Sequence, residues 1–385
     1  NGTAQWQARG NGGDGFFAAF DPLSSTKTQG NWYTEYTYGA LSCSTTGAQG
    51  PFFSTCTGGW YTSFGFQIDR SDWSTPFVLD QAHCSSTKCS NIILGTHRLW
   101  ASGSGGTIRS SWVPVSPDLT RGNISNDNAS NTIIDVRFAP SSPTSAVAGT
   151  DDGNVQWSNT ILGGPNCTTA AANTASFSCT PVAGASWVNL AKGNTVLPNR
   201  AIQGVGFDPS DDRVVYAAVG GFNANTPSTP GHLFQASCAA NCASASNWSW
   251  ADKTANLPDV PADSVIANPN NRKQVFVGTH FGFYYTNDID AQPVVWQRYQ
   301  NSLPNTVIKY LTIDRGATTL AAFTYGRSLY TIKLPGTSGF GEPLPAPANL
   351  AAQAISSQQI DLQWSDQSST ETGFLIERCT GAGCS

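Results

Sequence analysis

The sequence predicts an all-β fold, a β-propeller built of four-stranded blades. Short segments that alternate apolar and polar residues run along the chain, and Gly and Asn separate them. Alternation on a period of two is typical of strands, and no segment of helical length shows the period of an amphipathic helix. A four-strand pattern recurs roughly every 45 to 70 residues, which indicates propeller blades.

The repeated unit begins with an apolar strand, continues through a strand that ends in Gly-Thr or a similar tight turn, and adds a third strand and a variable loop. The six opening strands are "FFAAFDP" (16–22), "PFVLD" (76–80), "IIDVRFAP" (133–140), "IQGVGFDPSDD" (202–212), "SVIANPNN" (264–271) and "IKYLTIDRG" (308–316). Four units close with a tryptophan-containing strand, at Trp112, Trp187, Trp248 or Trp250, and Trp296. Residues 1–335 are therefore expected to form about six blades.

The ends of this region leave two interpretations of ring closure. The last unit, residues 308–334, lacks a fourth strand, and the opening "TAQWQARG" (3–10) carries Trp6 where that strand would have a tryptophan. In the first interpretation this segment completes the last blade and closes a six-bladed ring, which protects strand edges. In the second it ends an earlier blade, and the chain is part of a larger propeller.

A change of composition marks the end of the propeller. Residues 336–346 form a Pro/Gly linker. Residues 347–385 alternate on a period of two and resemble the first strands of a bacterial fibronectin type III domain, including Trp364 and the "GFLIER" strand. Such a β-sandwich takes ~100 residues, so this segment is expected to be a partial sandwich, and the chain a piece of a longer protein.

Composition excludes several classes of partner. Charged residues make up 12% of the chain, the net charge is -5, and no block of basic residues is present. These features argue against nucleic acid and anionic membranes as partners. No stretch approaches the ~20 apolar residues of a membrane span.

The ten cysteines fall into close pairs, which predict local disulfides. The pairs are Cys43 with Cys56, Cys84 with Cys89, Cys167 with Cys179, Cys238 with Cys242, and Cys379 with Cys384. Disulfides indicate a secreted or cell-surface, extracytoplasmic protein. Because the loops are short, the disulfides are expected to staple loops rather than define the fold.

The blade pattern resembles the BNR or Asp-box propellers of the sialidase-like and sortilin-like superfamily. The segments that carry the resemblance are "LGTHRLWASGSGG" (94–106), "AGTDDGNVQWS" (148–158), "FDPSDDRVVYAAV" (207–219), "VGTHFGFYYTND" (277–288) and "TYGRSLYTIKL" (324–334). In that superfamily an Asp-box caps the loop after the third strand. Here "SGSGGTIRSSW" (102–112) keeps Trp112 without the Asp, and "TNDIDAQPVVW" (286–296) keeps Asp288 and Trp296 without the Gly. Other loops carry the cysteine pairs, and there disulfides are expected to replace the cap. A segment like the opening one occurs in mid-propeller in large bacterial members, which favours a larger propeller.

The candidate ligand site lies where turns between second and third strands and links between blades open on one face. The ligand-binding candidates there are Asp14, His97, Arg98, Asp151, Asp152, His280, Tyr325 and Arg327. Mixed charges and aromatic faces suit a glycan. Asp152 and Gly153 also have a simpler interpretation as turn residues. Glu35 is interpreted as a glutamate on the solvent face of a strand.

These observations lead to three functional hypotheses. The first is a binding or scaffold module for glycans or other extracellular partners. The second is a glycoside hydrolase that uses an Asp pair at the mouth, since hydrolysis needs two carboxylates; the motifs of sialidases are absent. The third is a structural subunit that self-assembles through its incomplete C-terminal domain. No zinc motif, phosphate-binding loop or nucleophile elbow occurs, so no metal and no cofactor is predicted, and the catalytic residues are left unassigned. Under the second hypothesis, mutation of Asp151 together with Asp14 should abolish activity.

Overall fold

The computed structural model describes residues 16–26, 28–60, 68–120, 131–161, 187–299, 303–334, 347–367 and 374. The chain divides into two compact units, residues 1–337 and 338–385. Within the described residues the first unit holds six antiparallel sheets, four of them with four strands and two with three. The prediction of an all-β propeller with about six blades is confirmed.

The strands of each sheet follow one another in sequence from the centre of the ring outwards. They are β1 (Ala18–Phe20), β2 (Trp32–Glu35) and β3 (Leu41–Ser44); β4 (Phe77–Leu79), β5 (Ile92–Gly95), β6 (Leu99–Ser102) and β7 (Val113–Pro114); β8 (Ile133–Ala139), β9 (Ser142–Thr150), β10 (Val155–Ser158) and β11 (Val188–Asn189); β12 (Ile202–Asp208), β13 (Asp211–Val219), β14 (Leu233–Cys238) and β15 (Trp248–Asp252); β16 (Ala262–Asn268), β17 (Asn271–Thr279), β18 (Gly282–Thr286) and β19 (Gln297–Arg298); and β20 (Ile308–Ile313), β21 (Thr319–Thr324) and β22 (Leu329–Lys333).

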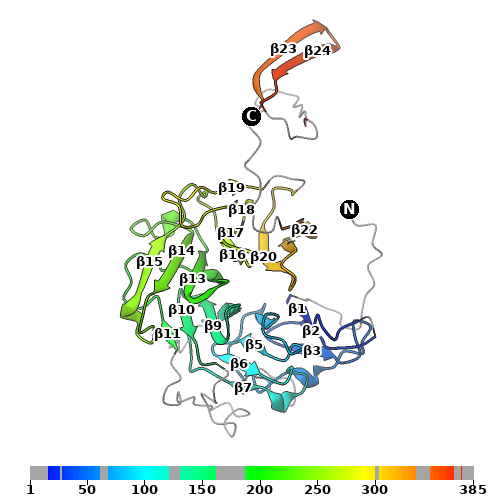
Figure 1. Cartoon of the computed structure of the whole chain (residues 1–385), viewed down its shortest axis with the longest axis vertical. Coiled ribbons are helices and arrows are strands. Elements are labelled where there is room, and N and C mark those ends of the chain that lie inside the picture. The colour runs from blue at the N-terminus through cyan, green and yellow to red at the C-terminus, as the bar shows by residue number, and fades with distance from the viewer. Residues whose placement is uncertain are drawn as a thin grey trace. The chain divides into compact units, whose positions relative to one another are not determined.

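The six sheets surround a common centre, with the first sheet (blue) next to the last (orange) in Figure 1. The first strands of successive sheets contact one another from β1 to β20. The ring of Phe17 lies 5.4 Å from the ring of Tyr310 on β20, so the first and last sheets meet. Residues 3–10, on which the two interpretations of closure depend, lie outside the described residues.

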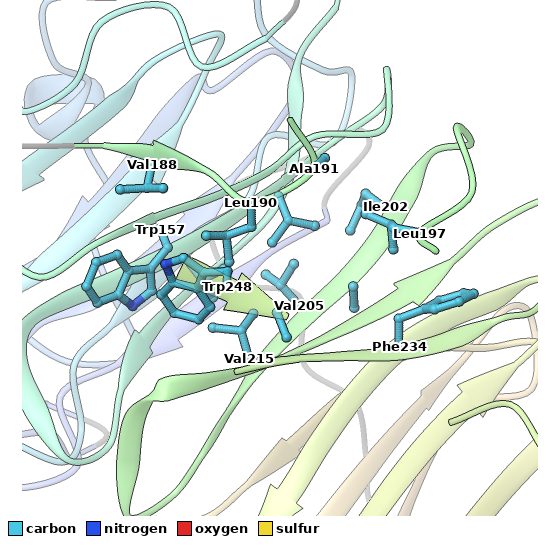
Figure 2. Packing of buried hydrophobic residues seen from close by; sticks show 14 of the residues in the cluster. Trp157, Val188, Leu190, Ala191, Leu197, Ile202, Val205, Val215, Phe234 and Trp248 are labelled. Carbon is cyan, nitrogen blue, oxygen red and sulfur yellow. The ribbon is translucent and has the colours of Figure 1, made fainter. Parts of the chain in front are cut away.

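Apolar side chains fill the space between neighbouring sheets. Between the third and fourth sheets, Trp157 and Trp248 pack with ring centroids 5.0 Å apart, and Val205, Val215 and Phe234 complete the cluster (Figure 2). A strand covered by a sheet on each side buries both of its faces, which is why all four residues of β5 are buried. Burial of this kind supplies most of the stabilisation of the fold.

The recurring Gly-Thr pair has a structural cause. A Cβ at Gly149 would lie 2.8 Å from Cγ2 and 2.9 Å from the carbonyl oxygen of Ile202, the first residue of the next inner strand. Gly95 meets Ile133, and Gly278 meets Ile308, in the same way. The second strand therefore ends in glycine because the next blade begins against it.

We expect Gly149→Ala to lower the free energy of unfolding by about 1–3 kcal/mol, because the added methyl overlaps backbone that cannot move away easily. Denaturant unfolding measures the change. Gly103→Ala is the matched control, because its nearest neighbour would be Asn91 Oδ1 at 3.9 Å. Equal stability of the two variants would contradict this account of the motif.

The loops between third and fourth strands share one arrangement. The indole N–H of Trp112 donates to the Gly106 carbonyl at 3.0 Å, and that of Trp248 donates to the Cys242 carbonyl at 2.9 Å. In the second of these loops a Cys238–Cys242 disulfide closes the turn, and in the first Ser102 Oγ accepts the Gly106 N–H. The exchange of an Asp-box cap for a disulfide and membership of the Asp-box superfamily stay predictions.

The predicted cysteine pairs have different outcomes. The Cys84–Cys89 and Cys238–Cys242 disulfides are confirmed. Cys43 and Cys56 are two buried thiols in this structure, so the predicted bond between them is not formed. The two thiols nevertheless lie in contact, since Cys43 is a side-chain hydrogen-bond partner of Cys56. The Cys56 thiol also donates to the Leu41 carbonyl at 3.3 Å, and the Cys43 thiol donates to the Thr107 carbonyl at 3.7 Å. Cys167, Cys179, Cys379 and Cys384 lie outside the described residues.

The second unit contains one antiparallel hairpin, β23 (Ala348–Ser356) with β24 (Gln359–Ser365). Its apolar side chains Leu350 and Ile360 are exposed. A hairpin alone does not form a sandwich core, so the fibronectin type III assignment, the exact domain boundaries and self-assembly through this unit stay predictions. Among the described residues, no helix is long and apolar enough to cross a membrane.

Candidate functional site

The turns between second and third strands and the links that enter the inner strands form one layer, which we call the mouth face. A backbone hydrogen bond joins turn to link around the ring: Tyr38 to Trp73, Leu119 to His97, Asp151 to Thr132, Gly220 to Ala201, His280 to Pro261 and Tyr325 to Val307. Turns and links therefore lie on the same face, as the sequence predicts. Asp14 lies outside the described residues.

Asp263 lies between the side chains of Lys309 and His280 on the mouth face. Its Oδ1 lies 2.9 Å from the Lys309 ammonium, and its Oδ2 lies 3.0 Å from Nε2 of His280. The Asp263 side chain is buried, whereas those of His280 and Lys309 are half exposed. Lys309 also reaches Gln203 Oε1 at 3.3 Å. Three neighbouring inner strands, β12, β16 and β20, thus each contribute a side chain to one hydrogen-bonded cluster. The exposed members of this cluster are Lys309 and His280.

Asp151 presents a carboxylate with an altered pKa. Its Oδ1 accepts the Thr132 N–H at 2.8 Å. Burial, together with the nearby charges of Asp152 and Asp72, raises the pKa of Asp151 to about 6, against the opposing effect of the Thr132 N–H. No cation pairs with Asp151 within the described chain. Asp151 is therefore a half-buried acid that changes charge in the physiological range.

Asp72 lies in the link that enters the second blade, and its charge acts on Asp151 in the third blade. Its Oδ1 accepts the Ser74 N–H at 2.8 Å, which fixes the link in a tight turn. Burial raises the pKa of Asp72, whereas the Ser74 N–H and the Lys309 ammonium lower it. Asp72 acts on the pKa of Asp151, and Lys309 acts on that of Asp72, so the second, third and sixth blades bring charges to one region. Asp72 was not among the predicted candidates.

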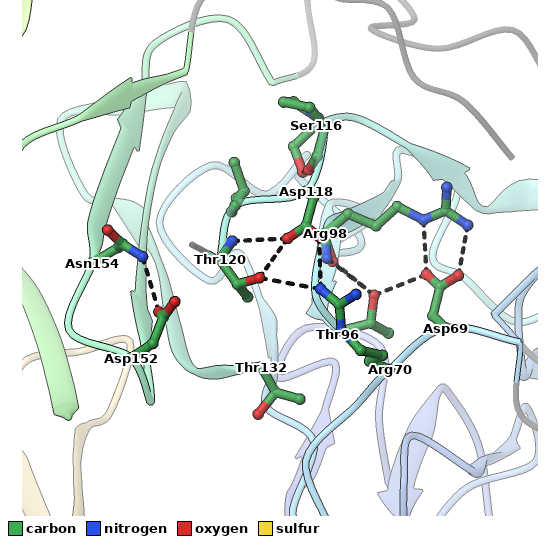
Figure 3. Close-up of polar contacts among 12 residues, drawn as sticks. Asp69, Arg70, Thr96, Arg98, Ser116, Asp118, Thr120, Thr132, Asp152 and Asn154 are labelled. Atoms are coloured by element: carbon green, nitrogen blue, oxygen red, sulfur yellow. Dashed lines mark hydrogen bonds and ion pairs between the residues drawn. The ribbon is translucent and has the colours of Figure 1, made fainter. Parts of the chain in front are cut away.

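Asp152 has the simpler role. Its Oδ1 accepts the Asn154 amide N–H at 2.9 Å and the Thr150 hydroxyl (Figure 3). Gly153 adopts φ 86°, where a Cβ would lie 2.9 Å from the Arg200 carbonyl oxygen. These contacts are those of a tight turn.

The expectation that Arg98 faces a ligand is corrected by its position. Arg98 is buried, and its guanidinium pairs with Asp69 through bonds of 2.6 and 2.8 Å (Figure 3). Asp69 Oδ2 also accepts the Trp100 indole N–H at 2.8 Å and the Thr96 hydroxyl at 2.9 Å. The side chain turns into the blade because this carboxylate satisfies it there. Arg98 is a structural residue.

His97 is mostly enclosed by its turn. Its Nδ1 is buried and has no hydrogen-bond partner within the described residues. Burial lowers the pKa of His97, with Asp69 and Asp118 opposing that effect. His97 is thus a partly buried ring of the mouth face, and its role as a ligand candidate stays a prediction.

Exposed aromatic side chains surround the polar groups of the mouth face. Within the described chain, the turns and links carry Tyr36, Tyr38, Trp73, Phe222, Phe281 and Tyr325. Tyr38 and Trp73 form an edge-to-face pair with centroids 5.1 Å apart, and the Arg298 guanidinium covers one face of Phe281 at 4.6 Å. Tyr325 is 79% exposed, and Arg327 beside it is also exposed. Trp73 was not predicted because it lies in a link, where no repeat pattern marks it.

Deeper in the ring the inner strands meet. The Arg137 guanidinium lies 4.3 Å over the ring of Tyr310, donates to its hydroxyl and pairs with Asp135 at 3.3 Å. Asp135 Oδ2 accepts the Val205 N–H at 2.9 Å. These contacts join the third, fourth and sixth blades below the mouth face. In the described part of the chain no group of three His, Cys, Asp or Glu residues could hold a metal ion.

Comparison with known proteins identifies the fold. No family model and no curated protein sequence matches the chain. An ancestral GH74 enzyme of known structure matches with a TM-score of 0.55 and 15% identity, covering 89% of this chain and 43% of that enzyme. The GH74 enzyme of Niastella koreensis matches with a TM-score of 0.48 and 16% identity, covering 92% of this chain and 49% of its own. The chain spans less than half of either enzyme, and its likeness to the ancestral GH74 enzyme shows a shared fold.

Proposed function

We propose that the mouth face of this propeller binds an extracellular glycan. The observation that carries the proposal is the set of exposed aromatic side chains, above all the Tyr38–Trp73 pair, around polar groups from several blades. Aromatic faces stack on the apolar faces of sugar rings. Such faces remain exposed on a protein when a partner uses them.

Polar groups suited to sugar hydroxyls lie among the aromatic ones. The Lys309 ammonium and the His280 imidazole, both held by Asp263, are donors, and the carboxylates of Asp151 and Asp72 are acceptors. A few placed polar groups within an apolar surround are typical of ligand sites. The two disulfides support an extracytoplasmic location. The GH74 enzyme of similar fold supports a carbohydrate ligand by analogy alone.

The test is a binding assay of the full chain against a panel of soluble neutral and acidic polysaccharides. We expect Trp73→Ala to weaken binding of the best ligand by about fivefold or more, since a stacking contact is worth about 1 kcal/mol or more. Phe53→Ala is the control, because Phe53 is exposed but lies beside Cys43 of β3, away from the turn. Equal loss in both variants, or no ligand in the panel, would reject the proposal.

Hydrolysis is a second candidate function, favoured by one observation. Asp151 has a pKa of about 6, close to that of a general acid. The charge of a second carboxylate, Asp72, contributes to raising this pKa. A glycosidase uses two carboxyl groups on either side of the bond. Asp14, the other predicted member of such a pair, lies outside the described residues.

If the chain is a hydrolase, we expect Asp151→Asn to lower reducing-sugar release by roughly 10²–10⁴-fold while binding persists. Asp290→Asn is the control, because this residue pairs with Arg272 in the loop before β19. If the unaltered chain binds a polysaccharide but releases no sugar from it, hydrolysis is rejected and only the binding function is retained.

A further inference from the structure

The first sheet buries one of its two faces against the second sheet. Alternation along β2 and β3 places Tyr33, Glu35, Leu41 and Cys43 on that face, and none of them is more than 2% exposed. The interpretation of Glu35 as a solvent-facing residue is therefore wrong, and its Oε1 accepts the Gly39 N–H at 3.1 Å. The apolar members of this face pack with side chains of β4 and β5. Cys43 is thus part of the interface between two blades.

A second cysteine reaches this face from the segment that follows β3. Phe53 pairs with Cys43 through two backbone hydrogen bonds, of 2.9 and 2.8 Å. The short 3-10 helix η1 (Ser54–Cys56) then turns Cys56 towards the same strand, where its thiol donates to the Leu41 carbonyl at 3.3 Å. The two thiols are side-chain hydrogen-bond partners. The fold therefore holds both sulfur atoms in contact.

The hydrogen bonds around Cys56 do not depend on its S–H group. The Leu41 carbonyl also accepts the Thr57 hydroxyl at 2.6 Å. The Phe53 carbonyl, which is the second acceptor of the Cys56 thiol at 3.5 Å, also accepts the Cys43 N–H. A buried acceptor is costly only when it loses its last donor. A bond between the two sulfurs would therefore leave both carbonyls satisfied.

Both sulfurs are closed off from solvent in the folded protein. Cys43 is 2% exposed and Cys56 is 0% exposed, and Trp60 lies in the same apolar cluster. The Trp60 ring packs edge-on against Trp100 and Trp112, with centroids 5.4 and 5.1 Å away. Burial also raises the pKa of the Cys56 thiol, and only a thiolate attacks a disulfide. An oxidant therefore cannot act on these thiols while the cluster is in place.

The two disulfides that are present differ from this pair in their exposure. Each contains one half-buried cysteine, Cys84 in the Cys84–Cys89 bond and Cys242 in the Cys238–Cys242 bond. A dissolved thiol or disulfide can therefore reach these bonds in the folded chain. They provide an internal reference for the reactivity of the buried pair.

We propose that Cys43 and Cys56 form a third disulfide, which closes during folding, before Trp60 and its neighbours cover the two sulfurs, and is then sealed. The proposal is independent of glycan binding. It gives the protein two folded forms, a dithiol and a disulfide, that do not interconvert without unfolding of this cluster. The form that a molecule adopts records whether it folded in a reducing or an oxidising compartment.

The bond forms by two exchange steps. The thiolate of one cysteine attacks a sulfur of an oxidant disulfide, such as oxidised glutathione, and releases one oxidant thiol. The thiolate of the other cysteine attacks the protein sulfur of this mixed disulfide and releases the second oxidant thiol. The protein loses two protons and two electrons and gains one S–S bond, and the S–S bond of the oxidant is reduced to two thiols.

The first test is whether the bond forms. The full chain is expressed once with export to an oxidising compartment and once in a reducing cytoplasm, free thiols are alkylated in denaturant, and disulfides are mapped by peptide mass spectrometry. We expect a peptide pair joined through Cys43 and Cys56 in the exported chain and two alkylated thiols in the other. Alkylated Cys43 and Cys56 in the exported chain, or bonds from either to another cysteine, would overturn the proposal.

The second test is whether the bond is sealed. The exported, folded chain is treated with dithiothreitol, and thiols are alkylated at intervals. We expect Cys43–Cys56 to be reduced roughly tenfold or more slowly than the two reference bonds, and as fast as they are in denaturant, because reduction needs access to a sulfur. Equal rates in the folded chain would contradict closure before burial.

Two matched variants each leave one cysteine without its partner. In Cys43→Ser, Cys56 should remain a thiol that iodoacetamide alkylates only after unfolding. In Cys238→Ser, the half-buried Cys242 should be alkylated in the folded chain. If Cys56 reacts in folded Cys43→Ser as readily as Cys242 does in its variant, the sulfurs are not sealed and the proposal is rejected.

Discussion

Replacing Asp69 with Asn is expected to lower the free energy of unfolding by about 3–5 kcal/mol, because the Arg98 guanidinium would stay buried without its counter-charge. The pair is well enclosed, with side chains 5% and 2% exposed for Arg98 and Asp69. Asp69 also accepts bonds from Thr96 and Trp100, so the change disturbs a network rather than one contact. Denaturant unfolding of the two proteins measures the difference.

Asp290→Asn is the matched control for this prediction. Asp290 pairs with Arg272 at 2.8 Å, but the two side chains are 38% and 46% exposed. An exposed pair contributes ~1 kcal/mol or less, because water screens it. If Asp69→Asn were no more destabilising than Asp290→Asn, Arg98 would not depend on this pair, and its place among the ligand candidates would have to be reconsidered.

The second large effect concerns the dependence of stability on pH. The pKa of Glu35 is raised to about 7 in the folded chain, from about 4.5 when the residue is exposed. The unfolded chain therefore loses this proton first as the pH rises, and stability falls between about pH 4.5 and pH 7. At 1.36 kcal/mol per pKa unit, the loss from Glu35 is roughly 3 kcal/mol. Asp151, with a pKa of about 6, acts in the same direction.

The measurement is unfolding of the unaltered chain and of Glu35→Gln at pH 5 and pH 7.5. Glu35→Gln cannot ionise, so its stability should fall less over this interval, and the difference between the two proteins isolates the contribution of Glu35. Parallel changes in both proteins would show that the pKa of Glu35 is ordinary and that the pH dependence comes from other groups.

The blade pattern could be predicted because its causes are local in sequence. The Gly-Thr pairs at 149–150 and 278–279 end a strand and begin a turn in which the Thr hydroxyl accepts a backbone N–H, from Asn154 and Phe281 respectively. A tight turn of this kind uses residues only a few positions apart. Its recurrence along the chain was therefore visible without any knowledge of tertiary contacts.

The candidate site could be predicted only in outline. The sequence indicated which turns lie on the mouth face, and it included His280 and Asp151, which the structure places there. It also included Arg98, because a turn residue gives no sign of whether its side chain points outwards. Asp69, which turns Arg98 inwards, is 29 residues away in the chain, and no local pattern connects the two.

Alternation, turn residues and repeat spacing by themselves determined an all-β propeller of about six blades, because each depends on residues close together in the sequence. The tertiary structure decided what the charged residues do. Lys309 meets Asp263 across two blades, Asp72 acts on Asp151 across two others, and Glu35 accepts hydrogen bonds from its own turn and from the link into the next blade. The physical reason is that burial and electrostatic pairing depend on distance in space, and ring closure brings together side chains that the sequence keeps far apart.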